Sequence, residues 1–364
     1  MHAALLANTD WLDDELTTFQ QLTVGLIDEQ VKLTRVMPVQ VGGRGIGLSD
    51  SPLLGAKLTW NETKLAPLNH RRLVKLSERL DAAGADLIHA LHSDLWLPAM
   101  VIGDQLDLPV VLGANAMEDV RQAGRLVGQI NPTRTVIAAT TEPIAEVIRQ
   151  RTQGTLRVEA IPPGVHVSGA TVTERPPAGE TPCFAVCGDG KMDEAYGSLI
   201  EGMRLLVESR PEVLFFLDGQ RTDQHQVWKA AQKAGLLGNV SMTPRRLGHR
   251  EMLLMADALV HPQPLGRSRG VVLLAMAHAM PVLATEDAGL DYLIDGETAW
   301  TLAEPDAEGW AALLERRITE PDEAAALGQR ARAWVGEHRL AASQIQRTIK
   351  LYHEMCGTPL PFPG

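Results

Sequence analysis

The chain has 364 residues, a length that suggests two domains of ordinary size. Its formal net charge is −11, so the overall charge balance does not indicate binding to nucleic acid. No apolar run reaches the roughly 18 residues of a membrane-spanning helix. The N-terminus lacks the basic segment and long apolar core of a signal peptide. The three cysteines are an odd, sparse set typical of a reducing compartment. We therefore expect a cytoplasmic protein, for which peripheral membrane contact stays open.

The first part of the chain alternates between apolar strands and helices. Residues 3–7 form a predicted buried strand, and Asn8 is suited to cap the helix expected from about residue 11 to 29. From residue 85 the alternation is regular, with predicted strands at 85–90, 109–114, 135–140 and 157–162 and predicted helices at 95–106, 117–128 and 142–150. This order predicts βαβ units and a parallel sheet, and the continuously apolar strands indicate burial on both faces.

A segment rich in proline, glycine and threonine, residues 163–182, separates this part from a second series. The second series has predicted strands at 183–187, 212–219, 239–243, 258–262 and 281–285 and predicted helices at 194–209, 223–235, 250–256 and 270–279. Three further predicted helices cover residues 307–318, 321–334 and 341–354. We therefore expect an N-terminal domain over 1–165, a linker over 166–182 and a C-terminal domain over 183–340, with ligands at the carboxyl ends of the strands.

The stretch from His261 to Gly296 carries the most specific pattern. It keeps Pro262, Ala275-Met276-Ala277, Pro281-Val282 and Ala284-Thr285 of the pattern P-S-x-x-E-G-x-G-x-x-x-x-E-A-M-A-x-G-x-P-V-x-A-T. Similar matches occur in order at residues 85–93, 108–113, 161–166 and 295–300. Over most of its length the chain thus resembles the family-four (group 1) retaining glycosyltransferases of the GT-B fold.

The resemblance implies a fold of two Rossmann-like, doubly wound α/β domains with parallel sheets that face an interdomain cleft. It implies that the final helix, residues 341–356, joins the N-terminal domain. It also implies sugar transfer from a nucleotide-sugar donor with retention, without a metal ion or other cofactor. The acceptor stays unknown, and no nucleic-acid partner is expected.

The charged residues of the family pattern are replaced. Gly188 is kept, but Asp189 and Glu194 stand where the family has the arginine and lysine that neutralise the donor diphosphate. Gly266 and Leu274 replace the two glutamates that address the donor sugar and the ribose. The family's glycine-rich N-terminal loop is replaced by the acidic stretch 8–15, and its histidine after the 108–113 segment by Asn115. Two anions in place of two cations would repel a diphosphate by several kcal/mol at an effective dielectric constant of about 20.

Cations elsewhere offer a relocated phosphate clamp. Its candidate contacts are Gly188, Lys191, Arg267, Ser268, Arg269 and the backbone at Gly270. The helix expected after residue 270 would add its amide groups, because helix N-termini bind anions. A second cationic group comprises Arg245, Arg246, His249 and Arg250. The alternative is that these are solvated surface side chains.

Histidines and cysteines point mostly to packing. His89 and His92 end a predicted strand, where a general base could act, but a packed or rim histidine is the alternative. His261 lies inside a strand and is expected to be structural. Cys183 and Cys187 share one face of a strand, and with no second ligand pair nearby they predict no metal site.

Two functions therefore stay open. One is a divergent glycosyltransferase that uses a nucleotide sugar through the relocated clamp. The other is a non-catalytic protein of this fold that serves as a binding module or as the partner subunit of an active glycosyltransferase. An unrelated Rossmann enzyme is disfavoured because no strand-linked G-x-G-x-x-G occurs.

Overall fold

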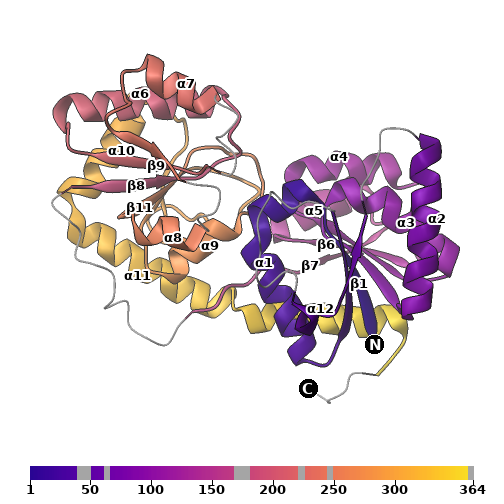
Figure 1. Cartoon of the computed structure of the whole chain (residues 1–364). Coiled ribbons are helices and arrows are strands. Elements are labelled where there is room, and N and C mark those ends of the chain that lie inside the picture. The colour runs from indigo at the N-terminus through magenta and orange to yellow at the C-terminus, as the bar shows by residue number, and fades with distance from the viewer. Residues whose placement is uncertain (39–50, 61–65, 168–180, 220–225, 244–248, 360–364) are drawn as a thin grey trace. The chain divides into compact units, whose positions relative to one another are not determined.

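The computed structural model describes residues 1–38, 51–60, 66–167, 181–219, 226–243 and 249–359, and they form two compact units (Figure 1). Most of the predicted linker, 166–182, lies outside these residues. The first unit comprises Met1–Gly164, Gly266–Ser268 and Ala341–Gly364. The second comprises Val165–Leu265 and Arg269–Leu340.

The first unit is built on a parallel sheet. Its described strands are β1 (His2–Leu6), β2 (Lys32–Met37), β3 (Ala56–Thr59), β4 (Leu87–Ala90), β5 (Val110–Ala114), β6 (Thr135–Ala139) and β7 (Arg157–Ala160). They are ordered β3-β2-β1-β4-β5-β6-β7, with parallel pairing throughout. The order reverses between β1 and β4, so this unit has a doubly wound switch point there.

Helices cover both faces of this sheet. Their bounds are α1 (Thr9–Asp28), α2 (Ala66–Ala83), α3 (Trp96–Leu106), α4 (Met117–Leu126), α5 (Glu142–Arg151) and α12 (Ala341–Cys356). Alternate residues of β1 divide between two cores, since side chains alternate along a strand. Ala4 and Leu6 pack with α2 to α5, whereas Ala3 and Leu5 pack with α1 and α12. Asn8 caps α1 as predicted, because its side chain accepts from the backbone N of Trp11 at 3.0 Å.

The second unit repeats this plan. Its described strands are β8 (Cys183–Val186), β9 (Leu214–Leu217), β10 (Val240–Met242), β11 (Ala258–His261), β12 (Val282–Thr285) and β13 (Trp300–Leu302). They are ordered β10-β9-β8-β11-β12-β13, again with parallel pairing. The order reverses between β8 and β11.

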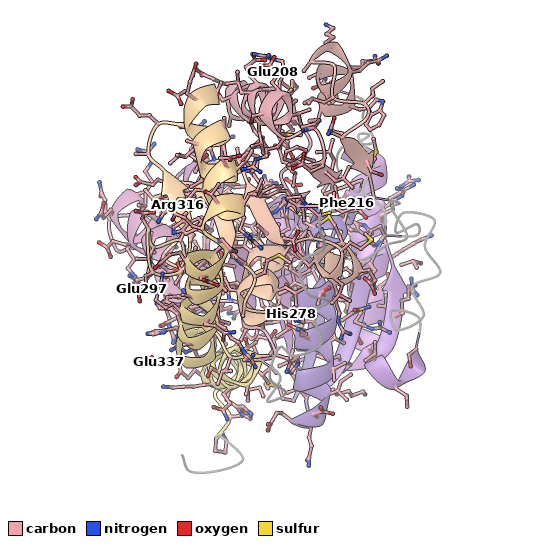
Figure 2. All side chains as sticks on the ribbon, turned by 90° about the vertical axis from the view of Figure 1, so that its left-hand side faces the viewer. Glu208, Phe216, His278, Glu297, Arg316 and Glu337 are labelled. Carbon is pink, nitrogen blue, oxygen red and sulfur yellow. The ribbon has the colours of Figure 1, made fainter. Side chains whose placement is uncertain are left out.

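Its helices are α6 (Glu194–Ser209), α7 (Gln226–Lys233), α8 (His249–Leu254), α9 (Gly270–Ala277), α10 (Ala307–Thr319) and α11 (Pro321–His338). Phe184 of β8 packs with α6, α7 and α10, and Ala185 packs with α8 and α9. Charged side chains such as Glu208, Arg316 and Glu337 point outward from the helices (Figure 2). The predicted α/β class with two Rossmann-like parallel-sheet domains is confirmed.

Candidate functional site

The carboxyl ends of β8 and β11 lie side by side at the switch point of the second sheet. Gln263, which is 1% exposed, ties these two ends together. Its Oε1 accepts from the backbone N of Asp189 at 2.7 Å. Its Nε2 donates to Oδ1 of Asp189 at 2.9 Å and to Oδ2 of Asp193 at 2.6 Å. Open α/β sheets bind ligands at such a point, so this edge is the candidate site of the second unit.

Asp189 is held firmly at this edge. Its side chain is 8% exposed, and its Oδ1 also accepts from the backbone N of Lys191 at 2.8 Å. The ammonium group of Lys191 lies 3.6 Å from Oδ2 but is 79% exposed, so the ion pair contributes little to stability. The position where the family pattern has an arginine thus carries a fixed carboxylate.

Gly188 is required by the packing around it. A Cβ there would lie 2.5 Å from both the Tyr196 hydroxyl and Oε1 of Gln263. Burial raises the pKa of Tyr196 far above its ordinary value, so the hydroxyl keeps its proton. The guanidinium of Arg269 donates from Nη2 to the carbonyl oxygen of Gly188 at 2.8 Å. The glycine that is kept from the family pattern therefore serves as a contact for a buried arginine.

The N-terminus of α9 lies beside this arginine. Arg269 occupies the N-cap position, is 2% exposed and makes no side-chain cap hydrogen bond. Its backbone N donates to the Tyr292 hydroxyl at 3.1 Å. Every residue of α9 from Val271 to Ala277 is buried. The positive end of the α9 helix dipole lies at this position, where it favours a nearby anion.

The other positions that are predicted to be replaced have structural roles. Glu194 begins α6 and is exposed, where a carboxylate favours the helix dipole. Leu274 is 9% exposed in the core that α9 forms with α8 and α11. His249 lies 3.2 Å from Oδ2 of Asp218, which is 2% exposed. Arg245 and Arg246 lie outside the described residues.

Gly266 cannot carry the glutamate of the family pattern. Its φ is +58°, in the left-handed region that side chains disfavour, and a Cβ there would lie 2.4 Å from Cγ of Met117. The backbone around it is held by two hydrogen bonds within the first unit, from Met117 N to the Gly266 carbonyl oxygen and from Ser268 N to the Asn115 carbonyl oxygen, each 2.9 Å long. A glutamate at this position would therefore be strained and would clash with Met117.

Substituting Gly266 with glutamate is expected to lower the free energy of unfolding by about 2–4 kcal/mol, because left-handed strain and overpacking act together. Urea unfolding measures the loss. The matched control is Gly128→Glu, since a Cβ at Gly128 meets no atom within 4 Å. A variant Gly266→Glu that is as stable as the wild type and binds nucleotide more tightly would contradict this prediction.

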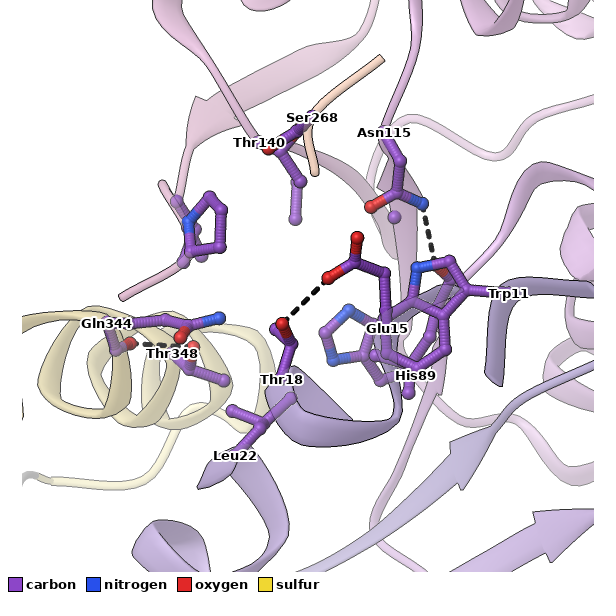
Figure 3. A pocket seen from close by; sticks show the side chains of 15 residues that line it. Trp11, Glu15, Thr18, Leu22, His89, Asn115, Thr140, Ser268, Gln344 and Thr348 are labelled. Carbon is purple, nitrogen blue, oxygen red and sulfur yellow. Dashed lines mark hydrogen bonds between the residues drawn. The ribbon is translucent and has the colours of Figure 1, made fainter. Parts of the chain in front are cut away.

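A pocket opens at the carboxyl ends of β4, β5 and β6 in the first unit (Figure 3). Its cavity measures about 60 Å³. Apolar walls come from Trp11, Leu22, Leu91, Ile161 and Pro163. Its polar lining includes Glu15, Thr18, His89, Asn115, Ser268 and Gln344. An apolar pocket with a few polar groups is the usual form of a small-molecule site.

His89 lines this pocket and is neutral. Burial lowers its pKa to about 3, and its Nδ1 lies 2.6 Å from the hydroxyl of Tyr352 on α12. Burial also raises the pKa of Tyr352, so the phenol keeps its proton. Within the described part of the chain, that proton has no acceptor besides Nδ1. We therefore place the imidazole proton on Nε2.

Asn115 and His92 are fixed by their neighbours. Asn115 donates from Nδ2 to the Leu91 carbonyl oxygen at 2.7 Å, and its backbone N donates to Oδ2 of Asp119 at 2.7 Å. Burial raises the pKa of Asp119. His92 accepts through Nδ1 from the backbone N of Asp94 at 3.3 Å, as expected of a rim histidine.

The acidic stretch that replaces the family's glycine-rich loop is buried in the first turns of α1. Asp13, Asp14 and Glu15 are each 8% exposed, and Glu15 has non-helical φ and ψ of −119° and 27°. Arg267 forms an ion pair with Glu118 and lies 4.0 Å from Oδ2 of Asp14. Arg267 thus contacts carboxylates of the first unit, whereas Arg269 contacts Gly188 of the second. The two arginines of the predicted clamp therefore belong to different units.

Metal-ligating residues do not gather in the described ranges, where no group of three or more His, Cys, Asp or Glu side chains could hold a metal ion. No described helix is both long and apolar enough to pass through a membrane.

A model of the family described as Glycosyl transferases group 1 matches residues 178–334. This segment is thus similar to a group 1 glycosyltransferase domain. Curated protein sequences give no match.

Solved structures share the fold of the whole chain at low identity. A glycosyltransferase from Rickettsia africae ESF-5 has a TM-score of 0.74 at 12% identity, over 97% of this chain and 98% of its own. Anabaena Alr3699/HepE in complex with UDP and glucose has a TM-score of 0.73 at 12% identity, over 97% of this chain and 100% of its own. WaaG, a glycosyltransferase involved in lipopolysaccharide biosynthesis, has a TM-score of 0.68 at 18% identity, over 98% of this chain and 100% of its own. The chain therefore has a GT-B-like fold of two Rossmann-like domains.

Three residues of these sites were not predicted from sequence. Gln263 contacts the end of β8 in the second unit from 74 positions away in the sequence, and Tyr352 contacts His89 from 263 positions away. Glu15 lines the pocket at a kink of α1. Gln263 stands two residues after a strand end, which was an available signal. No comparable signal in the sequence marks Tyr352, because the face of α12 on which it lies depends on how this helix packs.

Proposed function

We propose that the protein is a divergent group 1 glycosyltransferase that binds a nucleotide sugar at the β8–β11 edge and transfers the sugar with retention. The observation that carries this proposal is the N-terminus of α9 at the sheet edge beside the buried guanidinium of Arg269, which contacts Gly188. A diphosphate there would lie at the positive end of the α9 helix dipole and near a buried cation. Support also comes from Alr3699/HepE, whose structures hold UDP or UDP-glucose.

The proposed donor contacts are the residues around that helix end. Arg269 and the backbone at Gly270 bind the diphosphate, and Gly188 sets the position of Arg269. Lys191 adds an exposed positive charge beside Asp189. Arg267 and Ser268 of the predicted clamp belong to the first unit and are not part of this proposed set.

Calorimetric titration with UDP, GDP, ADP and UDP-glucose tests this proposal. We expect a micromolar Kd for at least one of them and at least a 30-fold weaker Kd in Arg269→Met. The matched control is Arg204→Ala on α6, which removes an exposed arginine paired with Glu201 and Glu208 and should leave the Kd unchanged. Retention is read from the anomer released on donor hydrolysis, by NMR.

A second candidate is a non-catalytic partner or binding module. The observation in its favour is the pair of carboxylates, Asp189 and Asp193, that share one amide at the expected diphosphate position. This candidate predicts that no nucleotide binds the folded wild-type chain. Binding that Arg269→Met abolishes while the variant stays folded would exclude it.

A further inference from the structure

A polar groove lies in the first unit between β7, the last strand of its described sheet, and α12. Its cavity measures about 310 Å³, which is large enough for a small molecule. The charged side chains of its lining are Arg157, Glu159, Arg347, Lys350 and Glu354. We call this cavity the β7–α12 groove.

The periods of the strand and the helix bring these charges together. Arg157 and Glu159 stand two positions apart on β7, so their side chains lie on the same face of the sheet. Arg347, Lys350 and Glu354 recur on α12 at intervals of three and four residues, so they share one face of the helix. The side chains of two elements thus line one cavity from opposite sides.

Both carboxylates of the groove are paired with one arginine. Nε of Arg157 donates to Oε1 of Glu159 at 3.0 Å, and its Nη2 donates to Oε2 of Glu354. Among the residues that the structure describes, Arg347 and Lys350 form neither a hydrogen bond nor an ion pair. Two cations therefore line the groove without a carboxylate partner, in a protein whose formal net charge is −11.

These two cations favour a doubly charged anion. A phosphate monoester carries a charge near −2 at pH 7, because its second pKa is about 6, and its oxygens accept several hydrogen bonds. A guanidinium group and an ammonium group supply only donors, so one phosphate can engage both Arg347 and Lys350. A concave site also strengthens this attraction relative to a flat surface.

We propose that the β7–α12 groove binds a phosphate group through Arg347 and Lys350. The groove belongs to the first unit, whereas the proposed donor edge belongs to the second. The phosphate group comes either from a soluble phosphomonoester or from a lipid headgroup. The proposal involves no step of sugar transfer, so it does not depend on the proposed function.

Calorimetric titration of the full chain with pyrophosphate at fixed ionic strength tests the proposal. We expect a millimolar Kd that is at least fivefold weaker in Arg347→Gln/Lys350→Gln. Glutamine is a good helix former, so this double variant should keep the melting temperature of the wild type. The matched control is Arg121→Gln/Arg125→Gln, which removes two exposed arginines from α4 of the same unit and should leave the Kd unchanged. Equal affinity of the wild type and Arg347→Gln/Lys350→Gln overturns the proposal.

Arg269→Met separates this site from the donor edge, where pyrophosphate could also bind. The groove should keep its affinity for pyrophosphate in Arg269→Met, whereas the donor edge should lose it. Binding that disappears in Arg269→Met and persists in Arg347→Gln/Lys350→Gln contradicts the groove and supports the donor edge. The reverse result supports the groove alone.

Vesicles distinguish the two sources of the phosphate group. The protein is sedimented with phosphatidylcholine vesicles that contain or lack phosphatidic acid, whose headgroup is a phosphate monoester. Retention that needs phosphatidic acid and is lost in Arg347→Gln/Lys350→Gln assigns the site to a lipid headgroup. Pyrophosphate binding without such retention assigns it to a soluble ligand. Binding of neither pyrophosphate nor phosphatidic acid overturns the proposal.

Discussion

Replacing Asp189 with asparagine should raise the affinity of the protein for UDP about tenfold. Asparagine keeps an oxygen that can accept from Lys191 N and Gln263 Nε2, so the local hydrogen bonds at the β8 edge can persist. It removes one buried negative charge from the expected diphosphate position. At an effective dielectric constant of about 20, a unit charge roughly 8 Å away is worth about 2 kcal/mol, which ionic screening reduces. Calorimetry at fixed ionic strength measures the change.

A remote aspartate provides the control. Asp306 caps α10 through Gly309 N, and Asp306→Asn makes the same change of charge while keeping a good cap residue. It should leave the Kd for UDP unchanged. If Asp189→Asn binds UDP no better than Asp306→Asn, the diphosphate does not bind beside Asp189, and the proposed donor edge is wrong.

Acidification from pH 7 to pH 5 should destabilise each unit by about 2 kcal/mol through one buried histidine. Burial lowers the pKa of His89 to about 3 in the first unit and that of His261 to about 4 in the second. Both are neutral when folded, but in the unfolded chain they take up protons below about pH 6.5. The unfolded state thus binds more protons as the pH falls. Their stability contribution is complete above pH 6.5 and is lost as the pH falls toward 4 and 3.

Asparagine tests this because its amide can replace the hydrogen bond at Nδ1. His89 uses that atom with the Tyr352 hydroxyl, and His261 uses it with the Cys187 carbonyl oxygen at 3.0 Å. Urea unfolding at pH 7 and pH 5 should show that His89→Asn and His261→Asn each remove about 2 kcal/mol of the acid-induced loss. His338→Asn, at an exposed position, is the control. If the double variant His89→Asn/His261→Asn loses as much stability between pH 7 and pH 5 as the wild type does, other groups cause the acid sensitivity.

Regular alternation made the layered fold predictable. A strand buried on both faces must be apolar at nearly every position, and this composition marks β5, β6 and β12 directly in the sequence. The three-residue strand β13 was not predicted, because a segment so short has no period and is defined by pairing with β12. The helix at 270–279 ends earlier, at Ala277, since Ala279 adopts a φ of +54°.

The candidate sites were only partly predictable. Sequence position identified Gly188, Asp189 and Leu274 as the residues that replace or keep the family pattern. It could not predict that Gly188 would accept a hydrogen bond from Arg269, or that Arg267 would pair with Glu118 instead. Long arginine side chains reach partners that depend on the fold of the loop, not on adjacent residues.

The sequence alone determined the α/β class and the resemblance to group 1 glycosyltransferases, because these follow from local composition and spacing. That the family's charged residues are replaced stays a prediction from the sequence. Only the tertiary structure decided which groups meet: Gln263 with Asp189, Tyr352 with His89, and Ser268 with the pocket of the first unit. These contacts join segments far apart in the chain. Strand order and helix register bring them together, and neither leaves a periodic signal in the sequence.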